Sequence, residues 1–367
     1  MKRRDLILQL SAAIPLAMIG TRSRTAWTAE SSHPADWRTF ELTTEVEVAS
    51  PQGTTQLWLP VPAVYRTDYQ RRLDVHWNAP GASHAGLVTL PGYDVELLHV
   101  EWRDARSIGP VTLVSRVSTR DRRVDVDSPP SHKPLREPSR VLQAYTRPTA
   151  LLPTDGIVRL TAERITRDRS GDVDKARAIY AWVVENTSRD PNVAGCGTGD
   201  VRLMLTSGNM GGKCADINAL FVALARSVGI PARDAYGVRV ADSKLGFKCL
   251  GRSGDVSKAQ HCRAEFYAQD YGWIPVDPAD VRKLMLEETP GGLQATDPKV
   301  ESARAMLFGG WEMNWVAYNH GHDIALPGAA LGPIPFLMYP NGESDGRFLD
   351  SLDPKAFRYE IHSSEVT

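Results

Sequence analysis

Cys214 occupies a position at which a cysteine can become a nucleophile. It follows two glycines that permit a sharp turn of the backbone, and it begins a run in which apolar residues recur with helical spacing up to Val228. Gly229 and Pro231 then stop the predicted helix. A helix N-terminus favours a thiolate, because its unpaired N–H groups and its dipole stabilise negative charge. The pattern predicts an activated thiol, with a small buried side chain as the plainer alternative.

A histidine and an aspartate follow in a predicted β-hairpin. Its arms begin near His261 and Trp273, and an Asp-Tyr-Gly turn separates them. If Arg263 pairs with Asp277, then His261 lies diagonally across from Asp277 on one face of the sheet, within reach of a hydrogen bond. A shift by one residue would separate them. Such a carboxylate orients the imidazole and stabilises the imidazolium, which holds a cysteine as thiolate. The alternative is a histidine with a structural role.

The ordered set of blocks over residues 170 to 285 resembles the transglutaminase-like core. It contains Gly-Gly-Lys-Cys-Ala-Asp at a helix start, Gly-Ile-Pro-Ala-Arg at its end, and Tyr-Gly-Trp-Ile-Pro-Val-Asp-Pro after the histidine. The resemblance implies Cys214 as nucleophile, His261 as general base and acid, and Asp277 as orienting carboxylate. It also implies an α+β fold of papain-like type, with helices packed on an antiparallel sheet. Arg263 departs from the family, in which an aromatic residue often follows the histidine by two positions.

The predicted chemistry is attack of a thiolate on an amide or peptide carbonyl in a peptide, a protein or cell-wall material. Family members include cross-linking transglutaminases, peptidases, amidases and proteins without the triad. Hydrolysis is expected, because the N-terminus resembles a bacterial export signal and no calcium-loop spacing is present. The alternatives are transfer to an amine, as in cross-linking, and a non-catalytic protein that binds peptides or cell-wall material. No cofactor or metal is expected, since His320 and His322 have no third ligand beside them.

Several further residues are candidates for contacts with the substrate. The Cys214 N–H supplies one oxyanion donor, and Asn209 and Asn192 are candidates for the second. The segment 241–260 is rich in glycine and lysine. It is either a loop over the cleft, whose charge indicates acidic groups on the substrate, or a solvated loop. The side chains predicted to contact the substrate are Arg263, Trp273 and Lys248.

Residues 1–29 resemble a secretory signal of twin-arginine type. Paired arginines precede Asp-Leu-Ile, and the apolar run that follows is too short for an ordinary transmembrane helix. A periplasmic or secreted protein is therefore expected, with an uncleaved N-terminal anchor as the alternative. The net charge of −1 and the absence of a basic block argue against nucleic acid as a partner.

The rest of the chain divides by pattern into four segments. Alternating runs between Pro and Gly clusters predict an all-β sandwich, which serves either as structural support or as a binding module. A proline-rich linker and the catalytic domain follow, and strands of a C-terminal extension are expected to pack on the core. The predicted segments are 30–126, 127–150, 151–290 and 291–367.

The four cysteines show no C-x-x-C pair, which argues against a zinc knuckle. If Cys214 stays reduced, three remain. A disulfide between Cys249 and Cys262, beside His261, is one hypothesis for an exported protein.

Overall fold

The structure, a computed structural model, describes residues 37–63, 67–92, 95–104, 106, 108–130, 134 and 136–366. These residues belong to one compact unit, which begins at Asp36. The predicted export signal, 1–29, lies outside them. Among the described residues, no helix combines the length and the apolar character that crossing a bilayer requires.

An antiparallel sheet of four strands carries the candidate site. Its strand order is β13-β12-β10-β15. Nearly every residue in it is buried, because apolar side chains of the helices cover one face and a cluster of aromatic side chains covers the other. The strands are β10 (Ala232–Arg239), β12 (Gln260–Ala268), β13 (Gly272–Val276) and β15 (Trp315–Asn319).

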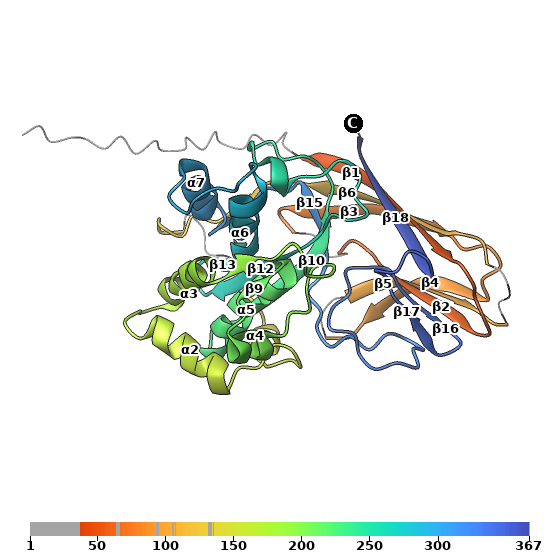
Figure 1. The fold of residues 1–367 in the computed structure, drawn as a ribbon, viewed down its shortest axis with the longest axis horizontal. Helices are drawn as coiled ribbons and strands as arrows, with labels where there is room; N and C mark the ends of the chain where they lie inside the picture. Colours follow the sequence, from red (N-terminus) through yellow and green to blue (C-terminus); the bar gives the residue numbers. More distant parts are fainter. Residues whose placement is uncertain are drawn as a thin grey trace, which may run out of the picture. The chain divides into compact units, whose positions relative to one another are not determined.

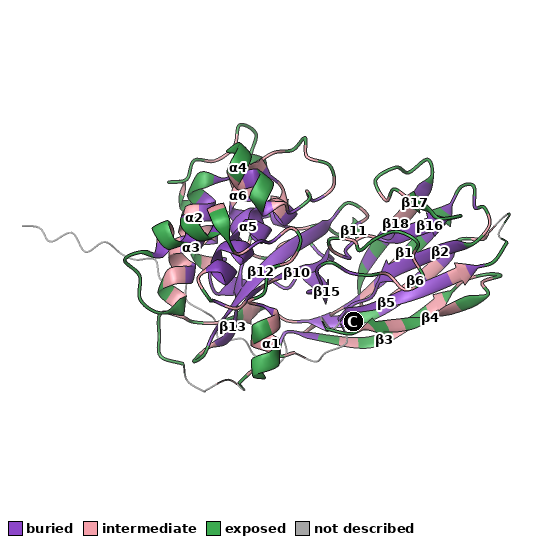
Figure 2. Ribbon diagram, turned by 90° about the horizontal axis from the view of Figure 1, so that it is seen from below, coloured by how far each residue is buried: buried purple, intermediate pink, exposed green. Residues whose placement is uncertain are grey.

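Helix α5 (Cys214–Ser227) lies among the other helices and packs on β12 and β10 (Figure 1). All of its residues except Asp216 are buried, so its sequence is apolar on nearly every side (Figure 2). Four helices contact it: α2 (Gly156–Thr166), α3 (Asp172–Asn186), α4 (Val201–Ser207) and α6 (Pro278–Glu287).

The predicted helix is confirmed, including the way it ends. Gly229 takes a φ of 84°, a left-handed conformation that favours glycine. The Ile230 N–H donates to the Ala225 carbonyl at 3.0 Å, which closes the last turn. Helix α5 ends at Ser227 with Val228 as its C-cap, in agreement with the predicted end near Val228.

Two five-stranded antiparallel sheets form a β-sandwich. Their orders are β11-β18-β1-β6-β3 and β17-β16-β2-β5-β4. Apolar side chains from both sheets share one core, among them Val46, Leu98 and Phe357. The predicted class, α+β with a β-rich N-terminal region, is confirmed. The strands are β1 (Arg38–Val48), β2 (Thr55–Pro60), β3 (Gln70–Asn78), β4 (His84–Leu90), β5 (Val95–Trp102), β6 (Val111–Thr119), β11 (Gly254–Asp255), β16 (Asn341–Ser344), β17 (Arg347–Leu349) and β18 (Phe357–Val366).

The C-terminal strands divide between the two regions. Strand β15 extends the four-stranded sheet, as expected, but β16, β17 and β18 pair within the sandwich. Strand β18 lies antiparallel to β1, from Thr39 opposite Val366 to Val48 opposite Phe357. Its buried and exposed residues alternate in part, which suits a sheet with one solvated face and not the doubly covered four-stranded sheet. The expectation that all these strands pack on the core was therefore wrong for β16 to β18.

Short elements complete the described chain. The predicted linker contains helix α1, and α7 packs against α6. Their bounds are α1 (Ser139–Ala144), α7 (Pro298–Met306), η1 (Lys248–Leu250), β7 (Arg122–Arg123), β8 (Ser188–Arg189), β9 (Gly211–Gly212) and β14 (Gly310–Trp311).

Candidate active site

Cys214 is the first residue of α5, as predicted, and it is buried. The helix start is fixed by the Asp216 carboxylate. It accepts hydrogen bonds from the Lys213 N–H at 2.9 Å and from the Thr198 and Gly199 N–H groups at 3.0 and 2.9 Å. These bonds tie the preceding loop to the first turn of the helix, so the position of the thiol is set by backbone contacts on two sides.

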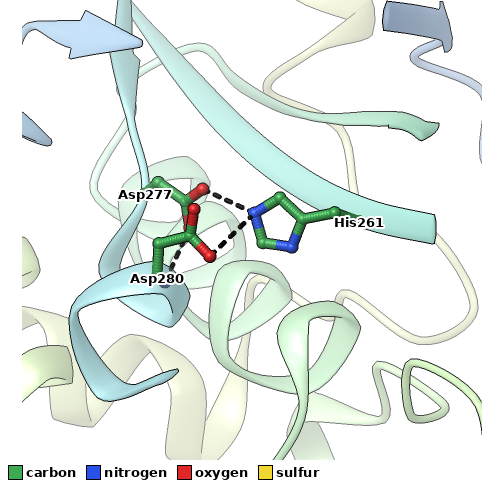
Figure 3. A group of neighbouring side chains, drawn as sticks. All are labelled: His261, Asp277 and Asp280. Atoms are coloured by element: carbon green, nitrogen blue, oxygen red, sulfur yellow. Dashed lines mark hydrogen bonds and ion pairs between the residues drawn. The ribbon is translucent and has the colours of Figure 1, made fainter. Parts of the chain in front are cut away.

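Strands β12 and β13 pair in the register that the sequence analysis required. Ala264 lies opposite Val276. Because the strands are antiparallel, one residue back along β12 and one residue past β13 set Arg263 opposite Asp277. His261 Nε2 is 2.7 Å from Asp277 Oδ2, and both side chains are buried (Figure 3). The second ring nitrogen, Nδ1, points away from the carboxylates (Figure 3). The structure thus brings the predicted histidine and aspartate together.

Asp277 is held by two other elements. It is the N-cap of α6, where its Oδ1 accepts from the Asp280 N–H at 3.0 Å. Asn218 Nδ2 donates to the same oxygen at 3.2 Å and to the Cys262 carbonyl at 2.8 Å. Asn218 follows Cys214 by one helical turn, so it ties the helix that begins at Cys214 to β12 and to the N-cap of α6. The sequence analysis missed it, although a lone asparagine in an apolar helix was an available signal.

A second carboxylate lies against His261. Asp280 Oδ1 is 3.3 Å from His261 Nε2 (Figure 3). The same oxygen accepts a hydrogen bond from Arg239 Nη2 at 2.6 Å. All three side chains are buried. The sequence analysis missed Asp280 and Arg239. Arg239 ends β10 and Asp280 lies in the first turn of α6, so only tertiary packing brings them together. The sequence around Asp280 alone indicates no more than the capped start of a helix.

These neighbours keep the His261 ring protonated. Burial and the Arg239 guanidinium lower the pKa of His261, but Asp280 and Asp277 outweigh them and raise it to about 9. The ring therefore favours the imidazolium form near neutral pH.

Polar neighbours favour the thiolate of Cys214. The pKa of Cys214 lies well below its usual value. The thiols of Cys196 and Cys262 lower this pKa most and His261 lowers it further; together they outweigh burial, which raises it. Cys196 is kept close by its carbonyl, which accepts from the Ala215 N–H at 2.9 Å. A thiolate beside an imidazolium is the arrangement of an activated cysteine nucleophile.

One cavity of about 850 Å³ is lined by both Cys214 and His261. The sandwich and the loop before β18 form one of its walls, which gives the β-rich region a direct part in the site. The residues of this wall are Ser351, Leu352, Pro354, Phe357 and Tyr359, with Tyr339 beside them.

Asn209 and Asn192, the candidates for the second oxyanion donor, are exposed and do not line the cavity. Asn209 Oδ1 accepts from the Gly211 N–H at 3.1 Å, which is turn chemistry. The Asn192 N–H donates to Asp190 Oδ1 at 2.9 Å. Both asparagines shape the backbone before α5 instead of facing the reacting atoms, so this prediction is corrected.

Arg263 does not line the cavity either, contrary to the prediction of a substrate contact. It is buried, its Nη1 donates to the Glu312 carbonyl at 3.0 Å, and its guanidinium lies over the Trp315 ring at 4.8 Å. Its Nε is 3.7 Å from Asp277 Oδ2. The arginine that departs from the family pattern thus supports the orienting carboxylate from inside the fold.

Trp273 and Lys248 also lie outside the cavity lining. Trp273 is buried against Tyr145, and its Nε1 donates to Glu137 Oε1 at 2.9 Å. Lys248 is exposed in η1, and its N–H donates to Glu288 at 3.2 Å. An aromatic on a doubly covered sheet fills the core, which is why Trp273 cannot reach a substrate.

All four cysteines are free thiols. Cys262 is fully buried with its Sγ 3.8 Å from Met338 Sδ, whereas Cys249 lies in η1. The hypothesis of a Cys249–Cys262 disulfide is therefore corrected.

His261, Asp277 and Asp280 bring ligand atoms within 4.8 Å of one another. Their charges are already balanced, because Arg239 donates to Asp280 and Arg263 lies 3.7 Å from Asp277. A cation bound here would add uncompensated positive charge beside two buried guanidinium groups. The mechanism below therefore uses no metal.

Comparison with known proteins agrees with this geometry. Residues 159–278 match the profile of the Transglutaminase-like superfamily, and this span contains Cys214, His261 and Asp277. A Haemophilus influenzae protein without an assigned function is 36% identical over 354 residues, which cover 91% of this chain and 94% of that protein.

A solved structure shares the fold. A candidate cysteine protease from Cytophaga hutchinsonii superposes with a TM-score of 0.56 at 14% identity, over 91% of this chain and 92% of that chain. The periplasmic domain of TgpA from Pseudomonas aeruginosa gives a TM-score of 0.34 at 12% identity, over 75% of this chain and 94% of that chain. Residues 159–278 of this chain therefore form a transglutaminase-like core domain.

Proposed function

We propose that this protein is a thiol hydrolase that cleaves an amide or peptide bond. One observation carries the proposal: Asp277 engages His261 Nε2, which leaves Nδ1 for the Cys214 thiol in the shared cavity. The Cys214 thiolate attacks the carbonyl, and the imidazolium protonates the leaving amine. Water then attacks the acyl-enzyme and gives its proton to the same nitrogen, and Cys214 departs as thiolate.

Tyr339 is the proposed second oxyanion donor. The first is the Cys214 N–H, which has no intrahelical acceptor because it begins the helix. Tyr339 lines the cavity, and among the described residues its buried hydroxyl has no hydrogen-bond partner of acceptable geometry. Burial, followed by the nearby thiols of Cys196 and Cys214, raises the pKa of Tyr339 well above its usual value, so the phenol stays a donor.

Tyr339→Phe is expected to lower kcat about 10²-fold with little change in KM, because only the donor to the oxyanion is removed. Steady-state kinetics on a fluorogenic amide measures the effect. Tyr359→Phe is the matched control, since Tyr359 lines the same cavity but its hydroxyl accepts from Gln260 Nε2 at 3.3 Å. Equal losses in the two variants would contradict the assignment.

Hydrolysis is favoured over transfer to an amine by the charge of the cavity. Lys213, Arg252 and Lys258 line it, and no carboxylate of the described chain does. A lysine acceptor is itself a cation near neutral pH and is repelled by this lining, whereas water is not. The export predicted from residues 1–29 would place the reaction outside the cytoplasm.

The first test is the pH dependence of alkylation. Iodoacetamide is expected to modify Cys214 rapidly below about pH 7, because the thiolate persists there. In His261→Ala the alkylation profile is expected to move to higher pH, since the cationic partner is lost while the Cys196 and Cys262 thiols remain. Cys249 is an internal control, because burial, followed by Glu288, raises its pKa. Mass spectrometry of alkylated peptides identifies each site. Slow reaction of Cys214 at low pH in both proteins would refute the ion pair.

The acyl acceptor is tested separately. Peptide amides are incubated with the protein and with Cys214→Ala, in the presence and absence of a fluorescent primary amine. Cys214-dependent cleavage without incorporation of the amine supports hydrolysis. Incorporation into the product would favour cross-linking, and binding without either reaction would favour a non-catalytic peptide-binding role.

A further inference from the structure

The cavity that contains Cys214 concentrates positive charge. No Asp or Glu among the described residues lines it. The chain as a whole carries a net charge of −1, so the positive lining is a local feature and not a general property of the protein. Its cationic residues are Arg189, Lys213, Arg239, Arg252, Lys258 and Lys283.

Three of these cations have a carboxylate partner, and two of the three are only partly neutralised. Arg239 is paired with Asp280 at 2.6 Å. Arg189 and Lys283 share the single carboxylate of Glu287, at 2.5 and 3.8 Å. Two cations therefore compete for one anion, and part of their charge remains available to a ligand.

The other three have no carboxylate partner within the described chain. Arg252 donates its Nε to the Asp255 carbonyl at 2.9 Å, which is a neutral acceptor. The Asp255 carboxylate is used locally, by the Ser257 N–H and hydroxyl at 3.0 and 2.6 Å. Lys213 and Lys258 likewise form no ion pair in this part of the molecule.

The cations flank both reacting groups. Lys213 directly precedes Cys214, and Arg189 lies opposite Gly212 where β8 pairs with β9. Lys258 precedes His261 by three residues along the approach to β12, and it lines the same cavity. A peptide bound at the Cys214 thiol would therefore meet positive charge near both reacting groups.

We propose that the substrate is an acidic peptide with carboxylates on both sides of the cleaved amide. That the bound peptide is cleaved rests on the proposed function. That an acidic peptide is preferred rests only on the charge of the cavity. Each exposed ion pair contributes little by itself, so selectivity requires several at once, which this lining supplies. Arginine also offers paired N–H donors that match a carboxylate, and both Arg189 and Arg252 line the cavity.

The binding test uses Cys214→Ala protein, which cannot be acylated. Three fluorescent peptides share one sequence and differ only in the flanking residues, which are Glu, Gln or Lys. We expect the Glu peptide to bind at least about tenfold more tightly than the Gln peptide, and the Lys peptide most weakly. The preference should shrink as salt rises from about 0.05 to 0.5 M, because screening shortens the reach of the charges.

Variants assign the preference to the cavity. In the same background, Arg252→Gln with Lys258→Gln is expected to reduce the Glu-to-Gln affinity ratio severalfold. The control is Arg159→Gln, since Arg159 is exposed on α2 and lies outside the lining; its ratio should match that of the parent. Circular dichroism confirms that each variant is folded.

Binding and turnover separate the two proposals. A preference for the Glu peptide that weakens with salt and in the double variant supports the acidic substrate. This holds even if the active protein cleaves none of the peptides, because absence of cleavage would count only against the proposed hydrolysis. Equal binding of all three peptides overturns the acidic substrate, and Cys214-dependent cleavage of them would then leave the hydrolase intact.

Discussion

Asp277→Asn is expected to lower kcat by about 10³-fold or more. Asp277 Oδ1 accepts from the Asp280 N–H and from Asn218 Nδ2. In the variant the amide oxygen must stay between these two donors, which turns the new NH₂ group toward His261 Nε2. That nitrogen then has to accept a hydrogen bond, so the ring loses the form that donates to the carboxylate and stabilises the thiolate.

The measurement is kcat and KM on a peptide amide, together with the thermal unfolding midpoint. The midpoint should stay near that of the parent, because asparagine is also a good N-cap and keeps the oxygen that caps α6. Asp280→Asn is the matched comparison: it removes the more distant carboxylate and should lower the His261 pKa and the alkaline limit of activity, with a smaller loss of kcat. If Asp277→Asn kept kcat within about tenfold of the parent, Asp280 would be the orienting carboxylate instead.

Arg239→Met is expected to destabilise the protein by about 3 to 5 kcal/mol. The change leaves the Asp280 carboxylate buried without its guanidinium, at a site where Arg239 is 3% exposed and Asp280 1%. Urea unfolding measures the loss. The double variant Arg239→Met, Asp280→Asn should recover much of it, because the buried charge disappears with its partner.

Two comparisons make this prediction specific. Arg358→Met removes an exposed arginine that pairs with Glu360, and it should not change stability measurably. Removal of Arg239 also removes a group that lowers the pKa of His261, so the alkaline limit of activity should move upward. If the double variant Arg239→Met, Asp280→Asn were no more stable than Arg239→Met, the lost stability would come from packing of the arginine stem and not from the unpaired charge of Asp280.

The parts of the site that the sequence predicted are those set by local rules. The start and end of α5 follow from apolar spacing and from Gly229. The placement of His261 and Asp277 on the same face follows from the pairing of a short hairpin. Because side chains alternate along a strand, the two residues can lie only on the same face or on opposite faces. In both cases the residues that fix the geometry lie within one element or in two adjacent ones.

The missed residues come from elements far apart in the chain. Arg239, Asp280 and Tyr339 meet the site only after β10, α6 and the segment before β16 have packed around it. The wrong prediction for Arg263 has the same cause. A charged residue two positions from a catalytic histidine suggests a solvated pocket, but aromatic side chains cover that face of the four-stranded sheet and place Arg263 in the core.

The pairing of β18 with β1 completes a wall of the cavity that contains Cys214. The ribosome makes α5 and the β12–β13 hairpin well before Phe357 and Tyr359, which lie on β18 and form part of the cleft wall. Phe357 and Tyr359 line the cavity only from a strand that is held by its pairing with β1. We therefore expect a chain truncated before Phe357 to lack part of the surface on which a peptide could be held beside Cys214.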